Sequence, residues 1–307
     1  MTGRPLTIGT RGSPLALAQA RMTASALEQA HGWAPGSVTI IPVKTSGDRI
    51  QDRPLAEVGG KALWTKELDL ALLTGETDCS VHSMKDVESE RPKTLAIAAM
   101  LQRADARDRL IGAGSIQALP ERAVVGTSSP RRKAQLLRLR PDLDIVSIRG
   151  NLDTRLGKLQ AGDVSATLLA AAGLDRLGRA ETGTAIALNE MIPAPAQGAI
   201  GIECRADDAV TAAWLRAIDH EETHAAVLTE RAFVRALNGT CHSPIGAHAV
   251  IEGGRIRFTC EILSEDGGER VVDCAVFAVG DLDTPAEMAR AMLAGAPDSI
   301  RHLFDAA

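Results

Sequence analysis

The chain has 307 residues, of which 45% are hydrophobic and 24% are charged, and its net charge at pH 7 is −5. A chain of this length exceeds the size at which one hydrophobic core usually keeps growing, so we expect two or three domains. Aromatic residues are scarce, with four Phe, three Trp and no Tyr. This scarcity and the negative charge argue against a nucleic-acid partner bound by base stacking or by a basic face.

The N-terminal stretch MTGRPLTIGT lacks the apolar core of a signal peptide, and no segment has the length and apolarity of a membrane span. We therefore expect a cytoplasmic protein without a membrane partner. The five cysteines are an odd number, widely spread and without a CxxC pair, which favours reduced thiols over a disulfide framework or a structural zinc site.

The first predicted elements are a strand at 6–10 and a helix beginning at Pro14, with Ser13 as its N-cap and Gly32 near its end. The periodicity predicts one apolar helix face made of Leu15, Ala18, Met22 and Ala26. This strand, turn and helix unit recurs, because GTRGSPLALAQ at 9–19 aligns with GTSSPRRKAQ at 126–135. The repeat indicates two α/β domains of like construction, although short turn-rich strings also match by chance.

The second copy of the unit has an unusual helix start. It places Arg131 and Arg132 in the first helical turn, where unpaired N–H groups and the helix dipole already carry positive charge. The sequence therefore predicts a negatively charged group beside these two arginines.

Further apolar segments predict parallel α/β layers, namely SVTIIPVKT, CSVHSM, LAIAAML, LDIVSI and SATLLAAA, with helices such as KALWTKELDLALLTG between several of them. Residues 218–307 differ. They predict a helix, antiparallel strands joined by the turns EGGR and EDGGE, and a final helix from about Pro285, which together indicate a separate small α+β domain.

Cationic side chains follow the predicted strands at their carboxyl ends, where open α/β sheets bind ligands. These residues are Arg11, Lys85, Arg131, Arg132, Arg149 and Arg176, with Arg155 one turn further along. A single arginine is usually a solvated surface residue, but the repeated position favours a ligand with several carboxylates or phosphates. Asp86 is the one carboxylate among them. Two roles are about equally consistent with its position. It could form a salt bridge, or it could be catalytic and protonate a leaving group or stabilise a cationic intermediate.

Cys241 lies in the predicted exposed loop NGTCHSPIGA, whereas Cys79, Cys204, Cys260 and Cys274 lie in or beside strand-like runs and are expected to be buried. Cys241 is either a bystander or a functional thiol. A Cys–His nucleophile with His242 lacks an orienting residue, and a metal site with His242 and His248 has too few ligands, so no metal is expected.

Together these residues resemble the porphobilinogen deaminase family, also called hydroxymethylbilane synthase. The resemblance runs nearly end to end through IGTRGSPLALAQA, VGGKALWTKELDLALL, VHSMKDV, VVGTSSPRRKAQL, SIRGNLDTRLGKL, LAAAGLDRLG, PAPAQGAIGIECR and NGTCHSPIGA.

This resemblance implies a transferase of tetrapyrrole and heme biosynthesis that joins four porphobilinogen molecules head to tail into hydroxymethylbilane, with release of four ammonia. It implies a dipyrromethane cofactor bound covalently to Cys241, a catalytic Asp86 that stabilises the cationic azafulvene, and a monomer. The cofactor-binding residues it implies are Ser13, Lys85, Asp86, Ser129, Arg131 and Arg132, and the substrate-binding residues are Arg11, Arg149, Arg155 and Arg176.

The fold implied by the resemblance is α/β, with two domains like type II periplasmic binding proteins and a smaller α+β C-terminal domain. The expected boundaries are 1–98 with 200–217, then 99–199, then 218–307, and PAPAQGAIGIECR is expected to return the chain from the second domain to the first. Three positions depart from the family pattern: Pro130, Glu57 and Trp64. A lysine contact is therefore not carried over to position 57, and Lys61 is only a candidate.

Two functions from other classes compete with this interpretation. A non-catalytic binding protein for polycarboxylate anions would explain the arginines but neither Asp86 nor the exposed thiol. A cysteine hydrolase would explain Cys241 and leave the arginines without a purpose. A bound dipyrromethane, detected by Ehrlich's reagent or by added mass, separates all three.

Overall fold

A computed structural model describes residues 6–45 and 65–305, which form two compact units. The first unit holds the described residues up to Arg103 together with Ala199–His224. The second holds Ala104–Gly198 together with the described residues from Ala225 onward. Within the described ranges, no helix is both long enough and apolar enough to cross a membrane.

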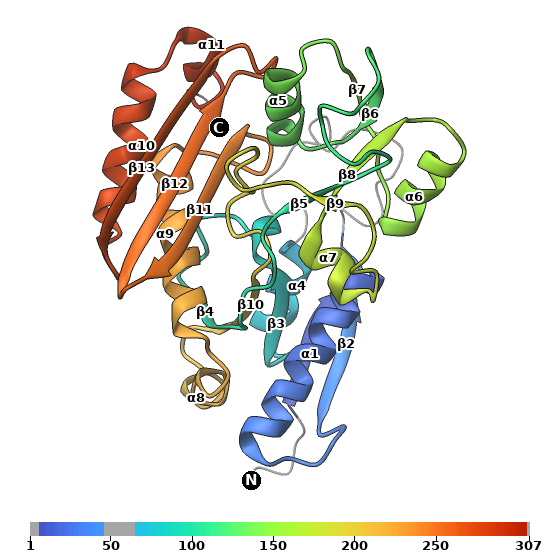
Figure 1. The fold of residues 1–307 in the computed structure, drawn as a ribbon. Helices are drawn as coiled ribbons and strands as arrows, with labels where there is room; N and C mark the ends of the chain where they lie inside the picture. The colour runs from blue at the N-terminus through green and yellow to red at the C-terminus, as the bar shows by residue number, and fades with distance from the viewer. Residues whose placement is uncertain (1–5, 46–64, 306–307) are drawn as a thin grey trace. The chain divides into compact units, whose positions relative to one another are not determined.

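The first unit is built on a five-stranded sheet with the order β2-β1-β3-β10-β4 (Figure 1). Its elements are β1 (Leu6–Arg11), α1 (Pro14–His31), β2 (Val38–Val43), α4 (Lys66–Leu73), β3 (Cys79–Ser83), the 3₁₀ turn η1 (Met84–Asp86), β4 (Leu95–Met100), β10 (Ile200–Arg205) and α8 (Ala209–Arg216). β10 pairs antiparallel with both β3 and β4. This pairing confirms that PAPAQGAIGIECR returns the chain to the first sheet.

Helix α1 confirms the predicted caps and corrects the predicted face. The Ser13 side chain accepts a hydrogen bond from the Ala16 N–H at 3.3 Å, and Gly32 ends the helix in the left-handed conformation. The buried stripe consists of Ala16, Gln19, Ala20, Thr23, Ala24 and Leu27, whereas Met22 is 45% exposed. The prediction was wrong here because apolar type alone was counted, and the polar Gln19 and Thr23 belong to the buried stripe.

The second unit contains another five-stranded sheet, with the order β7-β6-β8-β5-β9. Its elements are β5 (Asp108–Ile111), β6 (Val124–Gly126), α5 (Pro130–Leu139), β7 (Asp144–Val146), α6 (Leu152–Gln160), β8 (Ala166–Ala170), α7 (Ala171–Arg176) and β9 (Thr184–Ala185). β6 pairs parallel with β7 and β8, and β5 pairs antiparallel with β8.

The two sheets are built alike. β1 lies between the parallel strands β2 and β3, as β6 lies between β7 and β8. A helix opening with proline, α1 or α5, follows the central strand in each case. The internal repeat is therefore structural, and the expected pair of similar α/β domains is confirmed. Each sheet also contains an antiparallel strand, β10 or β5, which the prediction of parallel layers did not include.

The C-terminal region forms an α+β layer around a meander of order β11-β12-β13. Its elements are α9 (Glu221–Ala236), β11 (Ile245–Glu252), β12 (Arg255–Leu263), β13 (Arg270–Ala278), α10 (Asp283–Gly295) and α11 (Asp298–Arg301). Phe233 of α9, Phe258 of β12 and Met288 of α10 share one buried core, so both helices cover the same face of the sheet (Figure 1). A separate small C-terminal domain is thus confirmed.

The cysteines divide into two groups. Cys79, Cys204 and Cys260 are buried, and burial raises the pKa of all three thiols, that of Cys204 to about 11. Cys274 is exposed, so its predicted burial was wrong. Along the edge strand β13, Phe277 faces the core while Val272, Cys274 and Val276 alternate on the outer side. Cys241 is exposed as well.

Candidate active site

In the first unit, polar side chains follow the ends of two neighbouring parallel strands. Arg11 is the last residue of β1, and β3 leads directly into η1, which contains Lys85 and Asp86. Because the strands are parallel, their carboxyl ends share one edge of the sheet. Arg11, Lys85 and Asp86 are all half-buried, as is Ser13 at the start of α1. The structure therefore gathers these four predicted residues at one edge.

A side-chain pair fixes the start of α1 to the end of β3. The Gln19 amide donates to the Ser83 hydroxyl at 2.8 Å, and Gln19 Oε1 and Ser83 Oγ lie 3.1 Å apart. Gln19 is almost fully buried. The helix carrying Ser13 and the turn carrying Asp86 are therefore held in a defined relation.

Behind this edge lies a buried ion-pair network centred on Arg91. Its guanidinium forms a bidentate pair with Glu203, with both N–O distances 2.8 Å. It also contacts Glu88 at 3.0 Å and Asp69 at 2.5 Å. Burial is the largest cause that raises the pKa of Asp69, and the charge of Glu203 adds to it, although Arg91 acts in the opposite direction. Sequence reasoning missed this network, because its members are distant along the chain and belong to no recognised motif.

The network holds both ends of the segment that contains Asp86. His82, four residues before Asp86, lies 3.4 Å from Glu203, and Glu88 follows Asp86 by two residues. Burial alone would raise the pKa of Glu203, but the neighbouring His82 and the hydrogen-bonded Arg91 guanidinium lower it to about 2. Glu203 therefore remains an anion and a fixed anchor for the Asp86 turn.

In the second unit, the predicted residues again follow parallel strands. Ser129 caps α5 by accepting from the Arg132 N–H at 3.4 Å, directly after β6. Arg149 lies just beyond β7, and Arg155 in α6 donates from Nε to the Gly150 carbonyl at 3.1 Å. Arg176 does not follow a strand directly but is the last residue of α7, which begins where β8 ends.

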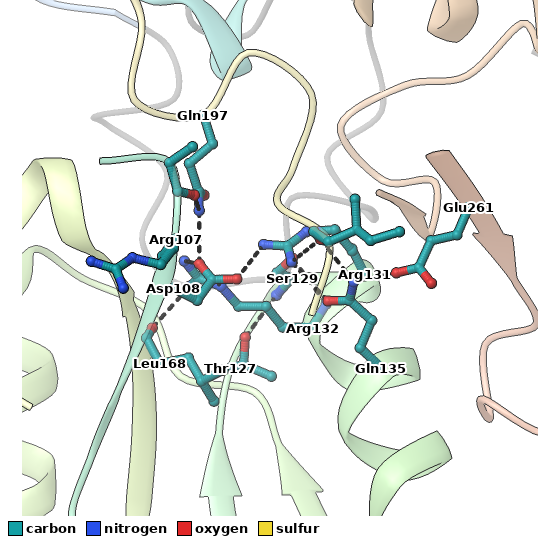
Figure 2. A network of polar contacts seen from close by, with 12 residues as sticks. Arg107, Asp108, Thr127, Ser129, Arg131, Arg132, Gln135, Leu168, Gln197 and Glu261 are labelled. Carbon is teal, nitrogen blue, oxygen red and sulfur yellow. Dashed lines mark hydrogen bonds and ion pairs between the residues drawn. The ribbon is translucent and has the colours of Figure 1, made fainter. Parts of the chain in front are cut away.

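Arg131 and Arg132 have their anion within the protein. Asp108, the first residue of β5, lies 2.8 Å from Arg131 Nη2 and 2.7 Å from Arg132 Nη2. Figure 2 shows the three residues together in one polar network. All three side chains are nearly fully buried. The sequence predicted an anion beside these arginines, but the prediction that no protein group pairs with them was wrong, because Asp108 is distant from them along the chain.

The Asp108 cluster is well compensated electrostatically. Burial alone would raise the pKa of Asp108, but the two guanidinium groups together with the Gln197 amide hold it well below its usual range. Arg132 also donates to the Leu168 carbonyl at 2.8 Å. Two guanidinium groups and one carboxylate leave about one unit of positive charge at the start of α5. The cluster can therefore still attract a carboxylate ligand.

Arg176 is held differently. Its Nη2 donates to the Gly198 carbonyl at 2.6 Å, and burial lowers its pKa to about 10. Its buried Nε has no hydrogen-bond partner among the residues that the structure describes. A desolvated guanidinium with an unused donor is suited to binding a carboxylate, which would supply both the charge and the missing hydrogen bond.

The thiol of Cys241 lies in a short, locally hydrogen-bonded loop. The Ser243 hydroxyl accepts from the Thr240 N–H at 3.1 Å, and the Thr240 hydroxyl accepts from the His242 N–H at 3.2 Å. Two side chains therefore shape the loop while the thiol stays exposed. Within the described residues, 6–45 and 65–305, no group of three or more His, Cys, Asp or Glu side chains could hold a metal ion.

The structure thus gathers Arg11, Ser13, Lys85 and Asp86 in one unit, and it places Ser129, Arg131, Arg132, Arg149, Arg155, Arg176 and Cys241 in the other. Glu57, Lys61 and Trp64 lie outside the described residues. Sequence reasoning missed Asp108 and Gln135. The repeat offered a signal for Gln135, since it aligns with Gln19, and both are buried.

Two family models match the chain. Residues 6–213 match "Porphobilinogen deaminase, dipyromethane cofactor binding domain", and residues 224–293 match "Porphobilinogen deaminase, C-terminal domain". The protein named porphobilinogen deaminase in Sphingopyxis alaskensis is 55% identical over 306 residues, which cover 98% of this chain and 96% of that protein. The protein of the same name in Paracoccus denitrificans is 50% identical over 86% of each chain.

Solved structures also resemble the chain, at low identity. A TRAP periplasmic solute binding protein from Desulfovibrio salexigens is 12% identical, with a TM-score of 0.42, covering 72% of this chain and 73% of that one. The second substrate binding domain of a putative amino acid ABC transporter from Streptococcus pneumoniae is 11% identical, with a TM-score of 0.43, covering 70% and 92%. These likenesses extend no further than the fold.

Proposed function

The chain belongs to the porphobilinogen deaminase family, and on that premise we propose how its own residues divide the work of the reaction. The family match over both parts of the chain carries the assignment: the enzyme is a transferase that condenses four porphobilinogen molecules head to tail into hydroxymethylbilane. In each step the C–N bond of the substrate aminomethyl group breaks and ammonia leaves. A C–C bond to the α-carbon of the growing chain forms, and that carbon loses its proton.

We propose that Asp86 is the catalytic residue. Departure of ammonia leaves a cation on the substrate, and the carboxylate can stabilise this charge and that of the ring that attacks it. Support comes from its place at the end of β3 in a turn anchored on both sides by the Arg91 network.

The dipyrromethane cofactor is proposed to be held covalently by Cys241. The chain fits this group, because the thiol is exposed while three of the other four cysteines are buried and have raised pKa values. When bound, dipyrromethane supplies the free α-carbon to which the first substrate ring is joined. Its carboxylates are proposed to be bound by Ser13, Lys85, Ser129, Arg131 and Arg132, and Asp86 also contacts it.

The substrate carboxylates are proposed to be bound by Arg11, Arg149, Arg155 and Arg176. The buried, unused Nε of Arg176 supports this role most directly. Arg131 also has a buried Nε without a hydrogen-bond partner among the described residues, whereas Asp108 occupies other donors of Arg131 and Arg132. Their contribution is the excess positive charge and the ordered helix start.

We further propose that the functional domains are 1–98 with 200–217, then 99–199, then 218–307. The chain passes between the two compact units after Arg103, Gly198 and His224, and each passage lies within seven residues of one of these boundaries. The proposed state is a cytoplasmic monomer. Five cysteines without a disulfide suit a reducing compartment, and size-exclusion chromatography with light scattering tests the monomer.

The function is tested by incubating the purified protein with porphobilinogen and measuring both products. We expect one hydroxymethylbilane and four ammonia for each four porphobilinogen consumed, and a coloured product with acidic Ehrlich's reagent from the protein itself. Binding of porphobilinogen without release of ammonia would instead support a non-catalytic polycarboxylate-binding protein.

A further inference from the structure

Glu261 is a buried carboxylate that belongs to none of the sequence motifs. It lies on β12 in the C-terminal region and is 1% exposed. Its Oε2 accepts from Arg270 Nε at 2.5 Å, and its Oε1 accepts from the Gln135 amide. Gln135 belongs to α5, the helix that begins with Arg131 and Arg132. A side chain of the cofactor-carrying region therefore reaches the helix of the arginine pair.

Gln135 also forms a hydrogen bond with Arg131, as Figure 2 shows. Its Oε1 accepts from Arg131 Nη1 at 2.7 Å, and its Nε2 donates to the Ile192 carbonyl at 2.8 Å. Arg131 Nη1 also donates to that carbonyl, at 3.0 Å. Because Glu261 and the Ile192 carbonyl both accept, the amide NH₂ must face them and the amide oxygen must face Arg131. The orientation of Gln135 is therefore set by Glu261.

The same residues contact the strand that follows the Cys241 loop. A Cβ added to Gly246 of β11 would lie 3.0 Å from Glu261 Cγ and 3.0 Å from Ile192 Cβ, so Gly246 packs directly between them. The next residue, Ala247, donates its N–H to the Pro193 carbonyl at 2.9 Å. β11 begins at Ile245, four residues after Cys241.

A second contact joins the C-terminal region to α5. Gly267, in the turn between β12 and β13, has a φ of +71°, and a Cβ added there would lie 2.2 Å from the Ala134 carbonyl oxygen. The backbone of the turn thus lies against the helix, with no room for a side chain. Helix α5 is therefore held both at this turn and through Glu261.

We propose that Glu261 and Gln135 form a positioning relay that orients Arg131 relative to the Cys241 loop during chain elongation. The inference rests on the proposed roles of Cys241 and Arg131. We assign neither relay residue a contact with substrate. Their effect is to keep the Arg131 guanidinium in one orientation, since Gln135, the Ile192 carbonyl and Asp108 all accept hydrogen bonds from its two Nη atoms.

The relay is tested by exchanging its two polar ends. Gln135→Glu places two buried carboxylates side by side, and we expect kcat/KM for porphobilinogen to fall at least about tenfold. Adding Glu261→Gln restores one amide and one carboxylate, with the carboxylate now facing Arg131. We expect this double variant to recover to within about threefold of the wild type. Glu252→Gln, on the exposed part of β11, is the matched control and should remain at wild-type kcat/KM.

All rates are measured well below the thermal midpoints of the variants, with cofactor loading checked by intact mass. If Gln135→Glu does not fold, the relay predicts that the double variant folds and is active. The relay is overturned if the double variant is no better than Gln135→Glu, or if folded, cofactor-loaded Gln135→Glu has wild-type kcat/KM. The thermal midpoints of the same variants can be measured without substrate. If Gln135→Glu lowers the midpoint, the double variant restores it and the wild type is inactive, then the proposed function has failed and the relay has not.

Discussion

The Asp108 carboxylate lies between the guanidinium groups of Arg131 and Arg132, at 2.8 Å and 2.7 Å. One buried anion thus holds two cations at a helix start, where the helix dipole alone would disfavour them. The pair remains positively charged as a whole. It is consequently both a structural element of the second sheet and a source of attraction for carboxylates.

Asp108→Asn should strongly destabilise the protein. The substitution keeps the shape but leaves two buried guanidinium groups without a counter-charge, at a cost of about 3–5 kcal/mol. Thermal unfolding measures the loss. Asp153→Asn removes one partner of the exposed pair with Arg179 and should change stability by less than about 1 kcal/mol. Equal midpoints for the two variants would contradict the structural role of Asp108.

Asp86→Asn should leave folding and cofactor attachment intact and lower turnover about 100-fold or more. The amide keeps the shape of the carboxylate but cannot stabilise a developing cation. Steady-state kinetics and intact mass give the two readouts. Glu90→Gln alters an exposed carboxylate in the same segment and should keep normal turnover. Near-normal turnover of Asp86→Asn would refute its catalytic assignment.

Arg176→Lys should lower kcat/KM for porphobilinogen about tenfold, mainly through KM. Lysine keeps the positive charge but loses the planar fork and the buried Nε that we assign to a substrate carboxylate. Arg179→Lys, three residues along the chain and half-exposed, provides the control. If the two variants have the same KM, Arg176 does not bind a substrate carboxylate.

Acid should destabilise the first unit through Glu203. The pKa of Glu203 is lowered from 4.5 to about 2 in the folded protein, so its stabilisation is complete above about 4.5 and is lost as the pH falls toward 2. The full contribution corresponds to about 3 kcal/mol. Glu203→Gln should therefore weaken the pH dependence of the unfolding free energy between pH 5 and 2. An unchanged slope would show that Glu203 is not held as an anion.

Thiol labelling should separate the five cysteines. In the native wild type, a maleimide should label Cys274 and not Cys241, because Cys274 is exposed and the cofactor occupies the other exposed thiol. In denaturant, four cysteines should react, since Cys79, Cys204 and Cys260 become accessible. Five labelled cysteines in denaturant would show that Cys241 carries no covalent group.

Local patterns predicted the elements of the fold well. Ser13 and Pro14 begin α1 as expected, and the repeat of this motif around Ser129 and Pro130 correctly indicated a second similar domain. These features depend on neighbours in the sequence. The residues at the ends of β1, β3 and β6 were found for the same reason, since strand ends can be located from apolar runs.

Buried ion pairs could not be predicted in this way. β5 has four residues, and DRLI, with its two charges, does not read as a strand, so Asp108 was not recognised as buried. Its pairing with Arg131 joins residues 23 positions apart through the antiparallel placement of β5. The Arg91 network joins residues as far apart as 112 positions. Such contacts depend on sheet order, which periodicity does not specify.

The most direct test of the account is the mass of the intact, purified protein, before and after adding a limiting amount of porphobilinogen. We expect a starting mass above that of the chain by one dipyrromethane, and we expect this added mass to be absent in Cys241→Ser. Porphobilinogen should then add stepwise increments, each equal to one porphobilinogen less one ammonia. A wild-type mass equal to that of the bare chain, with no increments, would contradict it.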